Sequence, residues 1–273
     1  MLRVASYRPE MTDEGIHRLH TTTVLDEHGE PRELSLTGER PLTIYLDKRE
    51  IVTLMTMGAQ PELLTLGYLR NQGLVERIED IVAIQVDWDV EAVAVTTRQV
   101  KADLEQVLSK RTVTSGCGQG TMFGNVMDSL NELTLECPSF SADAIYNVLE
   151  GVTEYNKMYK QAGAVHGCAL CIGNTVDIFV EDVGRHNAVD AISGWMWLNT
   201  VSGTEKVFYT TGRLTSEMVI KVAQMQIPLL LSRSGVTEMG LQLAKQVGIG
   251  MVARAKGKHF LVYNGQEQFE LDK

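Results

Sequence analysis

The stretch KVFYTTGRLTSEMVIKVAQMQIPLLLSRSGVTEMGLQLAKQVGIGMVA occupies residues 206–253. Three short apolar runs in this stretch predict β-strands, at residues 206–211, 228–231 and 249–253. The segments between them, residues 216–226 and 238–247, carry apolar side chains at helical spacing. Strands that alternate with helices through short connections are typical of an α/β fold. We therefore expect a mainly parallel sheet that is covered by helices.

The sequence before residue 206 predicts three hairpins and two helices. The hairpin strands occupy residues 41–46 and 51–57, 82–88 and 92–97, and 164–172 and 176–180. One helix begins near Pro61 and ends before Gly73, and the other is capped by Ser141 and ends at Gly163. The first 40 residues are polar and poorly periodic, so no element is predicted there.

These elements predict three parts of the chain. Residues 1–110 form a β-rich N-terminal region with one helix, residues 111–140 a glycine-rich cysteine loop and linker, and residues 141–273 an α/β domain. We find no internal repeat and no low-complexity linker.

Composition and charge exclude several classes of protein. The chain has 273 residues, of which 44% are hydrophobic and 22% charged, values typical of a folded globular protein. No apolar run approaches the roughly 18 residues that a membrane helix needs, and the first residues lack the apolar stretch of a signal peptide. We therefore expect a cytoplasmic protein. The net charge of −10 argues against nucleic-acid binding through a broad basic face.

Four arginines follow predicted strands. They are Arg185, Arg213, Arg233 and Arg254. The carboxyl ends of strands in an α/β sheet form its usual ligand-binding edge, and guanidinium groups bind phosphate in a bidentate manner. A pocket for a phosphorylated ligand is therefore one interpretation, and loop-capping ion pairs with neighbouring carboxylates are the alternative. No P-loop and no dinucleotide-binding glycine fingerprint occurs, which disfavours ordinary ATPase and hydride-transfer functions.

Cys117 lies in the glycine-rich segment TSGCGQGT, residues 114–121. Three glycines in five positions exclude a stable helix or a central strand and predict a loop. Successive backbone N–H groups in such a loop can hold an anion and stabilise a thiolate. We therefore expect Cys117 to be a reactive nucleophile rather than a small residue in a tight turn.

The other three cysteines were compared with the patterns of metal-binding sites. His166, Cys168 and Cys171 form an H-x-C-x-x-C pattern whose spacing suits zinc. On the predicted strand, however, Cys168 and Cys171 point to opposite faces, which disfavours a shared metal ion, so we expect no metal site. Cys137 has no partner pattern and is expected to be a buried or incidental thiol.

Several of these segments resemble the formate dehydrogenase accessory sulfurtransferases, the FdhD family. The resemblance covers about residues 35–265 and is most specific in the run VEDVGRHNAVD, residues 180–190. The other matching segments are GERPL at 38–42, TLM at 53–55, LGYL at 66–69, the Cys117 loop, TGR at 211–213 and AKG at 255–257.

The resemblance implies a cytidine-deaminase-like three-layer α/β core with a smaller appended domain. It also implies a homodimer that accepts sulfur from a cysteine desulfurase as a persulfide on Cys117. The sulfur would pass to the molybdenum of the bis(guanine dinucleotide) cofactor before that cofactor enters formate dehydrogenase, and GDP or GMP would act as fragment ligands. The cofactor-binding residues expected on this basis are Arg185, His186, Asn187, Gly212, Arg213, Arg254, Ala255, Lys256, Gly257, Lys258 and His259.

The sequence departs from the family at two places. Gly120 stands where many members have a second loop cysteine, so the resemblance does not extend to a disulfide-coupled mechanism there. Cys168 and Cys171 stand where small apolar residues are expected. Two alternatives remain: a non-catalytic chaperone that binds the cofactor or the apo-enzyme, and a zinc-dependent deaminase or hydrolase. The deaminase-like fold does not imply deamination, because the H-x-E and P-C-x-x-C motifs of zinc deaminases are absent.

Overall fold

The computed structural model describes residues 7–16, 19–99, 111–113, 121–123, 130 and 133–271, with the backbone only for 111–113 and 121–123. In these ranges the helices are α1 (Pro61–Asn71), α4 (Ala142–Thr153), α5 (Lys157–Ala162), α6 (Arg185–Leu198), α7 (Ser216–Gln224) and α8 (Glu238–Val247). No helix among the described residues combines the length and apolar character that crossing a membrane requires.

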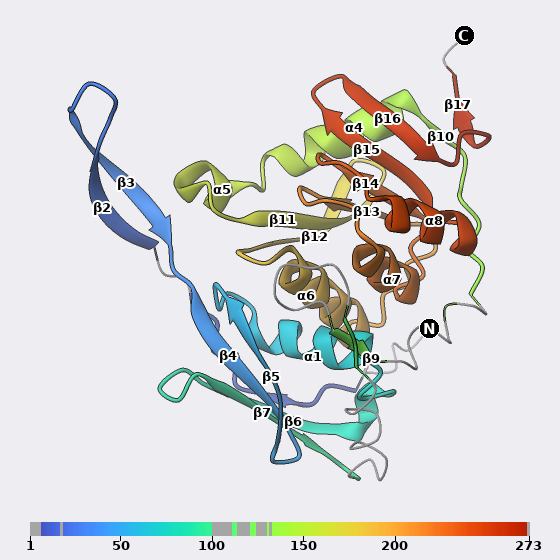
Figure 1. Cartoon of the computed structure of the whole chain (residues 1–273). Coiled ribbons are helices and arrows are strands. Elements are labelled where there is room, and N and C mark those ends of the chain that lie inside the picture. The colour runs from blue at the N-terminus through green and yellow to red at the C-terminus, as the bar shows by residue number, and fades with distance from the viewer. Residues whose placement is uncertain are drawn as a thin grey trace.

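A six-stranded sheet forms the C-terminal half of the molecule (Figure 1). Its order is β12 (Thr175–Asp182), β11 (His166–Ile172), β13 (Val207–Thr210), β14 (Leu229–Ser232), β15 (Gly250–Lys256) and β16 (His259–Asn264). The three central strands are parallel, as the alternating stretch predicts. The expectation of a mainly parallel sheet is nevertheless wrong, because the other three pairings are antiparallel. Two of these pairings, β11 with β12 and β15 with β16, belong to hairpins, whose short turns allow only antiparallel pairing.

A five-stranded sheet forms the N-terminal half. Its order is β1 (Glu10–Met11), β6 (Ile81–Asp87), β7 (Ala92–Thr97), β4 (Arg40–Leu46) and β5 (Arg49–Thr56). The two predicted hairpins of this region and the helix between them are confirmed. A short 3-10 helix, η1 (Ile78–Asp80), precedes β6.

Four further short or peripheral pairings complete the described chain. They involve the hairpin of β2 (Leu19–Leu25) and β3 (Pro31–Thr37), the pair β8 (Arg111–Val113) and β9 (Thr121–Phe123), the pair β10 (Phe140–Ser141) and β17 (Phe269–Glu270), and the bridge between Leu214 and Val236. The hairpin of β2 and β3 corrects the expectation that the first 40 residues lack structure. A compact turn closes it, in which the Asp26 carboxylate accepts hydrogen bonds from the backbone of His28 and Glu30.

Helices cover both faces of the larger sheet, as the expected three-layer arrangement requires. Helix α4 packs on one face, and its buried residues Ile145, Val148 and Val152 share a core with Ala169 and Tyr209. Helices α6, α7 and α8 cover the other face. The core on that side also contains apolar residues of α1 and of the N-terminal sheet, so the two sheets share one hydrophobic interior.

The predicted helix from Ser141 to Gly163 divides into α4 and α5. Ser141 caps α4 as expected, by accepting a hydrogen bond from the backbone N–H of Ala144 at 3.2 Å. The chain then bends at Asn156, whose side chain donates to the carbonyl of Val152 at 2.9 Å. The Glu181 carboxylate accepts hydrogen bonds from the first backbone N–H groups of α5 and thereby fixes its direction. This long-range contact explains why local periodicity predicted one continuous helix.

Helix α6 was not predicted, because it is buried on nearly all sides and lacks the amphipathic pattern that identifies a surface helix. Its backbone approaches α1 closely at two glycines. A Cβ atom at Gly67 would lie 1.7 Å from the carbonyl oxygen of Asp190, and one at Gly194 would lie 2.0 Å from the carbonyl oxygen of Leu63. The packing of α1 on α6 therefore requires glycine at both positions.

We predict that Gly67→Ala destabilises the protein, although alanine is favoured over glycine inside a helix by roughly 0.5–1 kcal/mol. The expected loss is about 1–3 kcal/mol, because the methyl group must displace backbone of α6. Urea unfolding measures it, with Gly235→Ala as the control. A Cβ atom at Gly235 meets nothing within 4 Å, so this variant should stay within about 0.5 kcal/mol of the parent. Equal stabilities of the two variants would contradict the packing.

Candidate functional site

The loops that follow β13, β14 and β15 are joined by hydrogen bonds. The backbone N–H of Arg233 donates to the carbonyl of Thr210 at 3.1 Å, and that of Arg254 donates to the carbonyl of Ser234 at 2.8 Å. The Ser232 hydroxyl donates to the carbonyl of Gly212 at 2.6 Å. The strand ends therefore meet at one edge of the sheet, as expected for an α/β ligand site.

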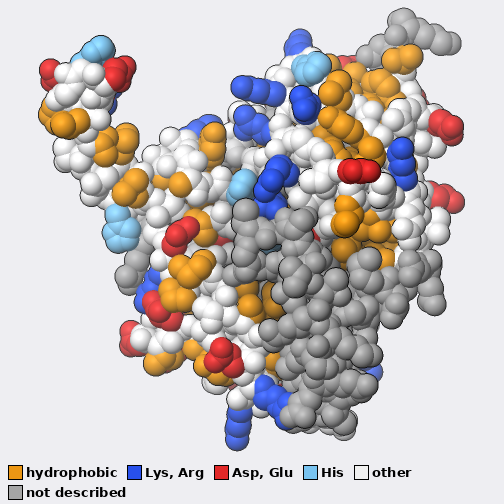
Figure 2. Space-filling view, in the orientation of Figure 1, with side chains coloured by type: hydrophobic (Ala, Val, Ile, Leu, Met, Phe, Trp, Pro, Cys, Tyr) orange, Lys and Arg blue, Asp and Glu red, His pale blue; other side chains and the backbone are white. Residues whose placement is uncertain are grey.

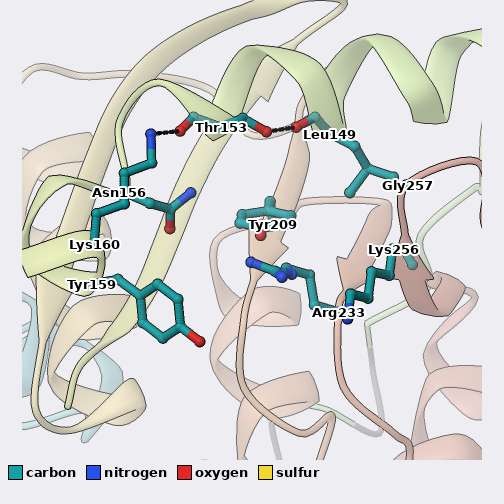
Figure 3. A pocket seen from close by; sticks show the side chains of 10 residues that line it. Leu149, Thr153, Asn156, Tyr159, Lys160, Tyr209, Arg233, Lys256 and Gly257 are labelled. Carbon is teal, nitrogen blue, oxygen red and sulfur yellow. Dashed lines mark hydrogen bonds between the residues drawn. The ribbon is translucent and has the colours of Figure 1, made fainter. Parts of the chain in front are cut away.

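A cavity of about 230 Å³ lies between these strand ends and the helices α4 and α5 (Figure 3). Arg233 and Lys256 enter it from the sheet, and Tyr159 of α5 faces them across the cavity. Its remaining lining residues are Leu149, Thr153, Asn156, Lys160, Tyr209, Ala255 and Gly257. Lys160 donates from Nζ to the carbonyl of Thr153 at 3.1 Å, so Arg233 and Lys256 are the cations best placed to meet a ligand.

A second cavity, of about 540 Å³, shares Tyr159, Arg233 and Lys256 with the first and extends to His166 and Ser234. We call the two together the edge cavity. Figure 2 shows Lys and Arg side chains gathered on the upper half of the molecule, where the strands of the larger sheet lie in Figure 1. The edge cavity is thus lined by three cations, Lys160, Arg233 and Lys256, although the chain has a net charge of −10.

Tyr209 forms the wall behind Arg233. Its side chain is buried and hydrogen-bonded to Arg233, and burial raises the pKa of its hydroxyl to about 12. Tyr209 therefore stays neutral and holds the guanidinium group in place.

His166 stands where the edge cavity meets the start of α6. Its Nδ1 atom lies 3.3 Å from the hydroxyl of Thr211. Burial lowers the pKa of this imidazole, and the charges of Arg185 and Arg213 lower it further. His166 is therefore neutral at pH 7 and can accept or donate a hydrogen bond. The sequence pattern around His166 points only to zinc and gives no sign of this location.

Arg185 begins α6 and packs closely against the loop after β13. A Cβ atom at Gly212 would lie 2.7 Å from Cδ of Arg185, so glycine at 212 makes room for this side chain. Arg185 is only 7% exposed, whereas Arg213 is exposed. The structure thus brings together three of the expected site residues, although neither arginine is among the lining residues of the described cavities.

Asn187, another expected cofactor-binding residue, is committed to structural contacts. Its side-chain amide donates to the carbonyl of Met55 at 2.7 Å and to the carboxylate of Asp182 at 2.8 Å. The same carboxylate accepts hydrogen bonds from the Thr56 hydroxyl at 2.6 Å and from the backbone of Met57 and Gly184. Burial raises the pKa of Asp182. These contacts join the N-terminal sheet to the start of α6.

His186 turns toward a buried polar network rather than toward the edge cavity. Its Nε2 atom lies 3.3 Å from Glu217, and Lys221 pairs with Asp190 at 2.8 Å. Asp190 also accepts a hydrogen bond from Asn71 of α1 at 2.7 Å. Burial lowers the pKa of His186 to about 2, with further contributions from nearby cations. His186 is therefore a neutral, largely buried residue.

The segment from Arg254 to His259 divides into two groups. Ala255, Lys256 and Gly257 line the edge cavity. Arg254, Lys258 and His259 are exposed and are not among the lining residues of either described cavity. The β15–β16 hairpin, with Gly257 at a φ of +60° in its turn, therefore presents Lys256 to the cavity.

Cys117 lies outside the described residues, in the segment 114–120 between β8 and β9. The expected opposite orientation of Cys168 and Cys171 is confirmed, since they belong to the cores on the two faces of the sheet. Burial raises the pKa of each thiol to about 12, so neither is a ready nucleophile. Cys137 is only partly buried. Within the described ranges, no three His, Cys, Asp or Glu side chains are grouped closely enough to hold a metal ion.

The contribution of α5 to the site was not predicted from the sequence. Tyr159 and Asn156 reach the cavity because the chain bends after α4, and that bend depends on Glu181, far away in the sequence. Tyr209 could have been found, since the alternation of β13 places it on the face opposite Phe208.

Fold and cavity define a mixed α/β protein with a cation-lined site at the strand ends of its larger sheet. A crystal structure of a proposed formate dehydrogenase accessory protein from Desulfotalea psychrophila has the same fold, with a TM-score of 0.73 and 26% sequence identity over 93% of this chain and 99% of that one. The FdhD/NarQ family model matches residues 37–270, and the chain belongs to this family. The resemblance drawn from the sequence is thereby confirmed.

Curated relatives match over most of their length. A protein of Wolinella succinogenes named sulfur carrier protein FdhD is 26% identical over 254 residues, which cover 91% of this chain and 88% of that protein. A protein of the same name from Listeria monocytogenes serotype 4b is 29% identical over 239 residues, covering 86% and 92%.

The low pKa of His186 predicts a contribution to the pH dependence of stability. The imidazole is neutral in the folded state but has a pKa of about 6.5 when unfolded, so unfolding takes up a proton below that pH. The contribution of His186 is thus present above about pH 6.5 and is lost as the pH falls toward its folded pKa, by at most roughly 1.4 kcal/mol per pH unit.

Urea unfolding of the parent and His186→Gln between about pH 7.5 and pH 4.5 tests this linkage. The stability of the variant should fall less steeply with decreasing pH. The exposed His259→Gln serves as the control and should keep the parent slope. If His186→Gln also keeps that slope, His186 is not held neutral by burial.

Proposed function

We propose that this protein is a sulfur carrier in the maturation of formate dehydrogenase. Membership of the FdhD/NarQ family and the names of its curated relatives support this role. Cys117 is proposed as the carrier residue, because its glycine-rich segment can expose a thiolate and surround it with backbone N–H groups. The high pKa values of Cys168 and Cys171 disfavour them as carriers. A cysteine desulfurase in the cytoplasm is the proposed sulfur donor.

The proposed sulfur transfer has two steps, and each moves one sulfur atom. In the first, the Cys117 thiolate attacks the terminal sulfur of the donor persulfide, a new S–S bond forms, and the donor cysteine leaves as a thiolate. In the second, this S–S bond breaks and Cys117 is restored as a thiolate. The terminal sulfur then becomes a sulfido ligand of the molybdenum in the cofactor that receives it. The molybdenum supplies the two electrons that the sulfur gains.

The edge cavity is the proposed site for the cargo, the bis(guanine dinucleotide) molybdenum cofactor. The observation that carries this assignment is that two adjoining cavities share Arg233 and Lys256. Guanidinium and ammonium groups bind phosphate, and Tyr159 offers an aromatic surface for a base. Arg185 and Arg213, whose charges act on His166, extend the positive region toward α6. The shape and charge of the cavity thus suit an elongated, phosphorylated ligand.

We predict that the parent protein gains the mass of one sulfur atom after incubation with a cysteine desulfurase and cysteine. Peptide mapping should place the added sulfur on Cys117, and Cys117→Ala should neither gain it nor activate formate dehydrogenase. Cys137→Ala, which changes another accessible thiol, is the control and should behave as the parent. A Cys117→Ala variant that still activates formate dehydrogenase fully would instead favour a non-catalytic chaperone.

We also predict that GDP binds to the edge cavity and that Arg233→Ala or Lys256→Ala weakens binding about tenfold, since a charge-assisted hydrogen bond contributes roughly 1.5–3 kcal/mol. Isothermal titration calorimetry at fixed low salt measures the change. Lys258→Ala is the matched control, because Lys258 is an exposed cation two residues from Lys256 that does not line the cavity. Equal weakening by all three substitutions would point to general charge attraction instead of this pocket.

A further inference from the structure

Asn156 stands at the bend between α4 and α5 and lines the edge cavity (Figure 3). It is only 6% exposed. Its amide nitrogen donates to the carbonyl of Val152 at 2.9 Å, which fixes the orientation of the amide group. The amide oxygen, Oδ1, is buried and has no hydrogen-bond partner among the residues that the structure describes. The fold therefore uses the donor of this side chain and leaves its acceptor unused.

The usual donors for such an oxygen are already occupied by another residue. An asparagine that precedes a helix normally accepts a hydrogen bond from a backbone N–H of the first helical turn. At α5 the backbone N–H groups of Met158 and Tyr159 donate instead to the Glu181 carboxylate, each at 2.9 Å. Asn156 accordingly makes no side-chain cap of α5. Its oxygen is left as an acceptor in the wall of the edge cavity.

The chemistry of the cavity indicates what would supply the missing donor. A buried acceptor without a donor weakens a fold, and native structures keep few of them, so a ligand that brings a donor is favoured here. Phosphate oxygens accept hydrogen bonds, so they suit Arg233 and Lys256 but do not suit this oxygen. The cavity wall also includes Leu149, Tyr159 and Tyr209, whose apolar and aromatic surfaces suit a flat base. A base is therefore the part of a nucleotide that fits Oδ1.

We propose that Oδ1 of Asn156 accepts a hydrogen bond from the exocyclic 2-amino group of a guanine base, which makes Asn156 a specificity-determining residue of the edge cavity. This assignment rests on the proposed function, because guanine is the base of the cofactor assigned to the cavity. An amino group projects beyond the ring, so it reaches a recessed oxygen more readily than a ring N–H does. Turning the amide to offer its NH2 group would break the bond to Val152, so this position accepts donors and rejects acceptors.

Tyr159 completes the proposed base site. Its side chain is 46% exposed and faces Arg233 and Lys256 across the cavity (Figure 3). Side-chain rotamers commonly change on binding, and a side chain with this exposure can turn as a base enters beside Oδ1. The tyrosine ring then covers one face of the base. In this arrangement the base lies at α5 and the phosphates extend toward the cations of the sheet.

A comparison of GDP with inosine diphosphate (IDP) tests this hydrogen bond without any change to the protein, because IDP lacks only the 2-amino group. Isothermal titration calorimetry of the parent at fixed low salt should show IDP binding about three- to tenfold more weakly, the effect of one net hydrogen bond. Equal affinities for GDP and IDP would overturn the role of Asn156 and leave the proposed cofactor site in place. Absence of binding by both nucleotides would overturn the two together.

Two substitutions separate recognition of the base from the bend of the chain. Asn156→Ala removes both the donor to Val152 and the acceptor in the cavity, so the ratio of the IDP and GDP dissociation constants should fall to about one. Asn156→Asp removes the amide donor but keeps an acceptor oxygen, so the preference for GDP should remain. A preference that persists in Asn156→Ala, or that disappears in both variants, would assign Asn156 to the bend alone and overturn the proposal.

Two further variants serve as controls for the ratio. Asn174→Ala changes an exposed asparagine of the β11–β12 turn that lines neither part of the edge cavity, so it should keep the parent ratio. Arg233→Ala should weaken GDP and IDP alike, because the two nucleotides carry the same phosphates. Loss of the GDP preference in Arg233→Ala together with its retention in Asn156→Ala would place the base elsewhere and overturn the proposal.

Discussion

The contact on which the rest of the structure depends is the hydrogen bonding of the Asp182 carboxylate. It accepts bonds from Thr56 and Met57 at the end of β5 and from Gly184 and Asn187 at the start of α6. A buried carboxylate without such donors would strongly destabilise the fold. The N-terminal sheet thus fixes where α6 begins, and with it the position of Arg185.

The position of α6 determines the electrostatics of the site. Arg185 at its first turn packs on Gly212. Burial lowers the pKa of His166, and the charges of Arg185 and Arg213 lower it further. Further along the helix, Asp190 pairs with Lys221 and accepts a hydrogen bond from α1. Helix α6 therefore places Arg185 near the strand ends. Its polar residue Asp190 instead holds α6 to α1 and α7.

The sequence predicted the elements whose signals are local. The central parallel strands, the hairpins and the helices at Pro61 and Ser141 follow from periodicity, turns and caps. Helix α6 was missed because burial on nearly all sides removes periodicity, and the break after α4 because it depends on distant Glu181. At the site, Lys256 and Gly257, two of the residues expected to bind the cofactor, line the cavity, whereas Asn187 and His186 contact polar groups of the interior.

The division of roles within residues 180–190 limits what this motif says about chemistry. Asp182, Asn187 and Asp190 are explained by contacts between the two halves of the fold, and no ligand is needed to account for them. A match to this run therefore identifies the architecture more directly than it identifies a reaction. The chemical assignment depends instead on Cys117 and on Arg233 and Lys256 of the edge cavity, none of which belongs to this run.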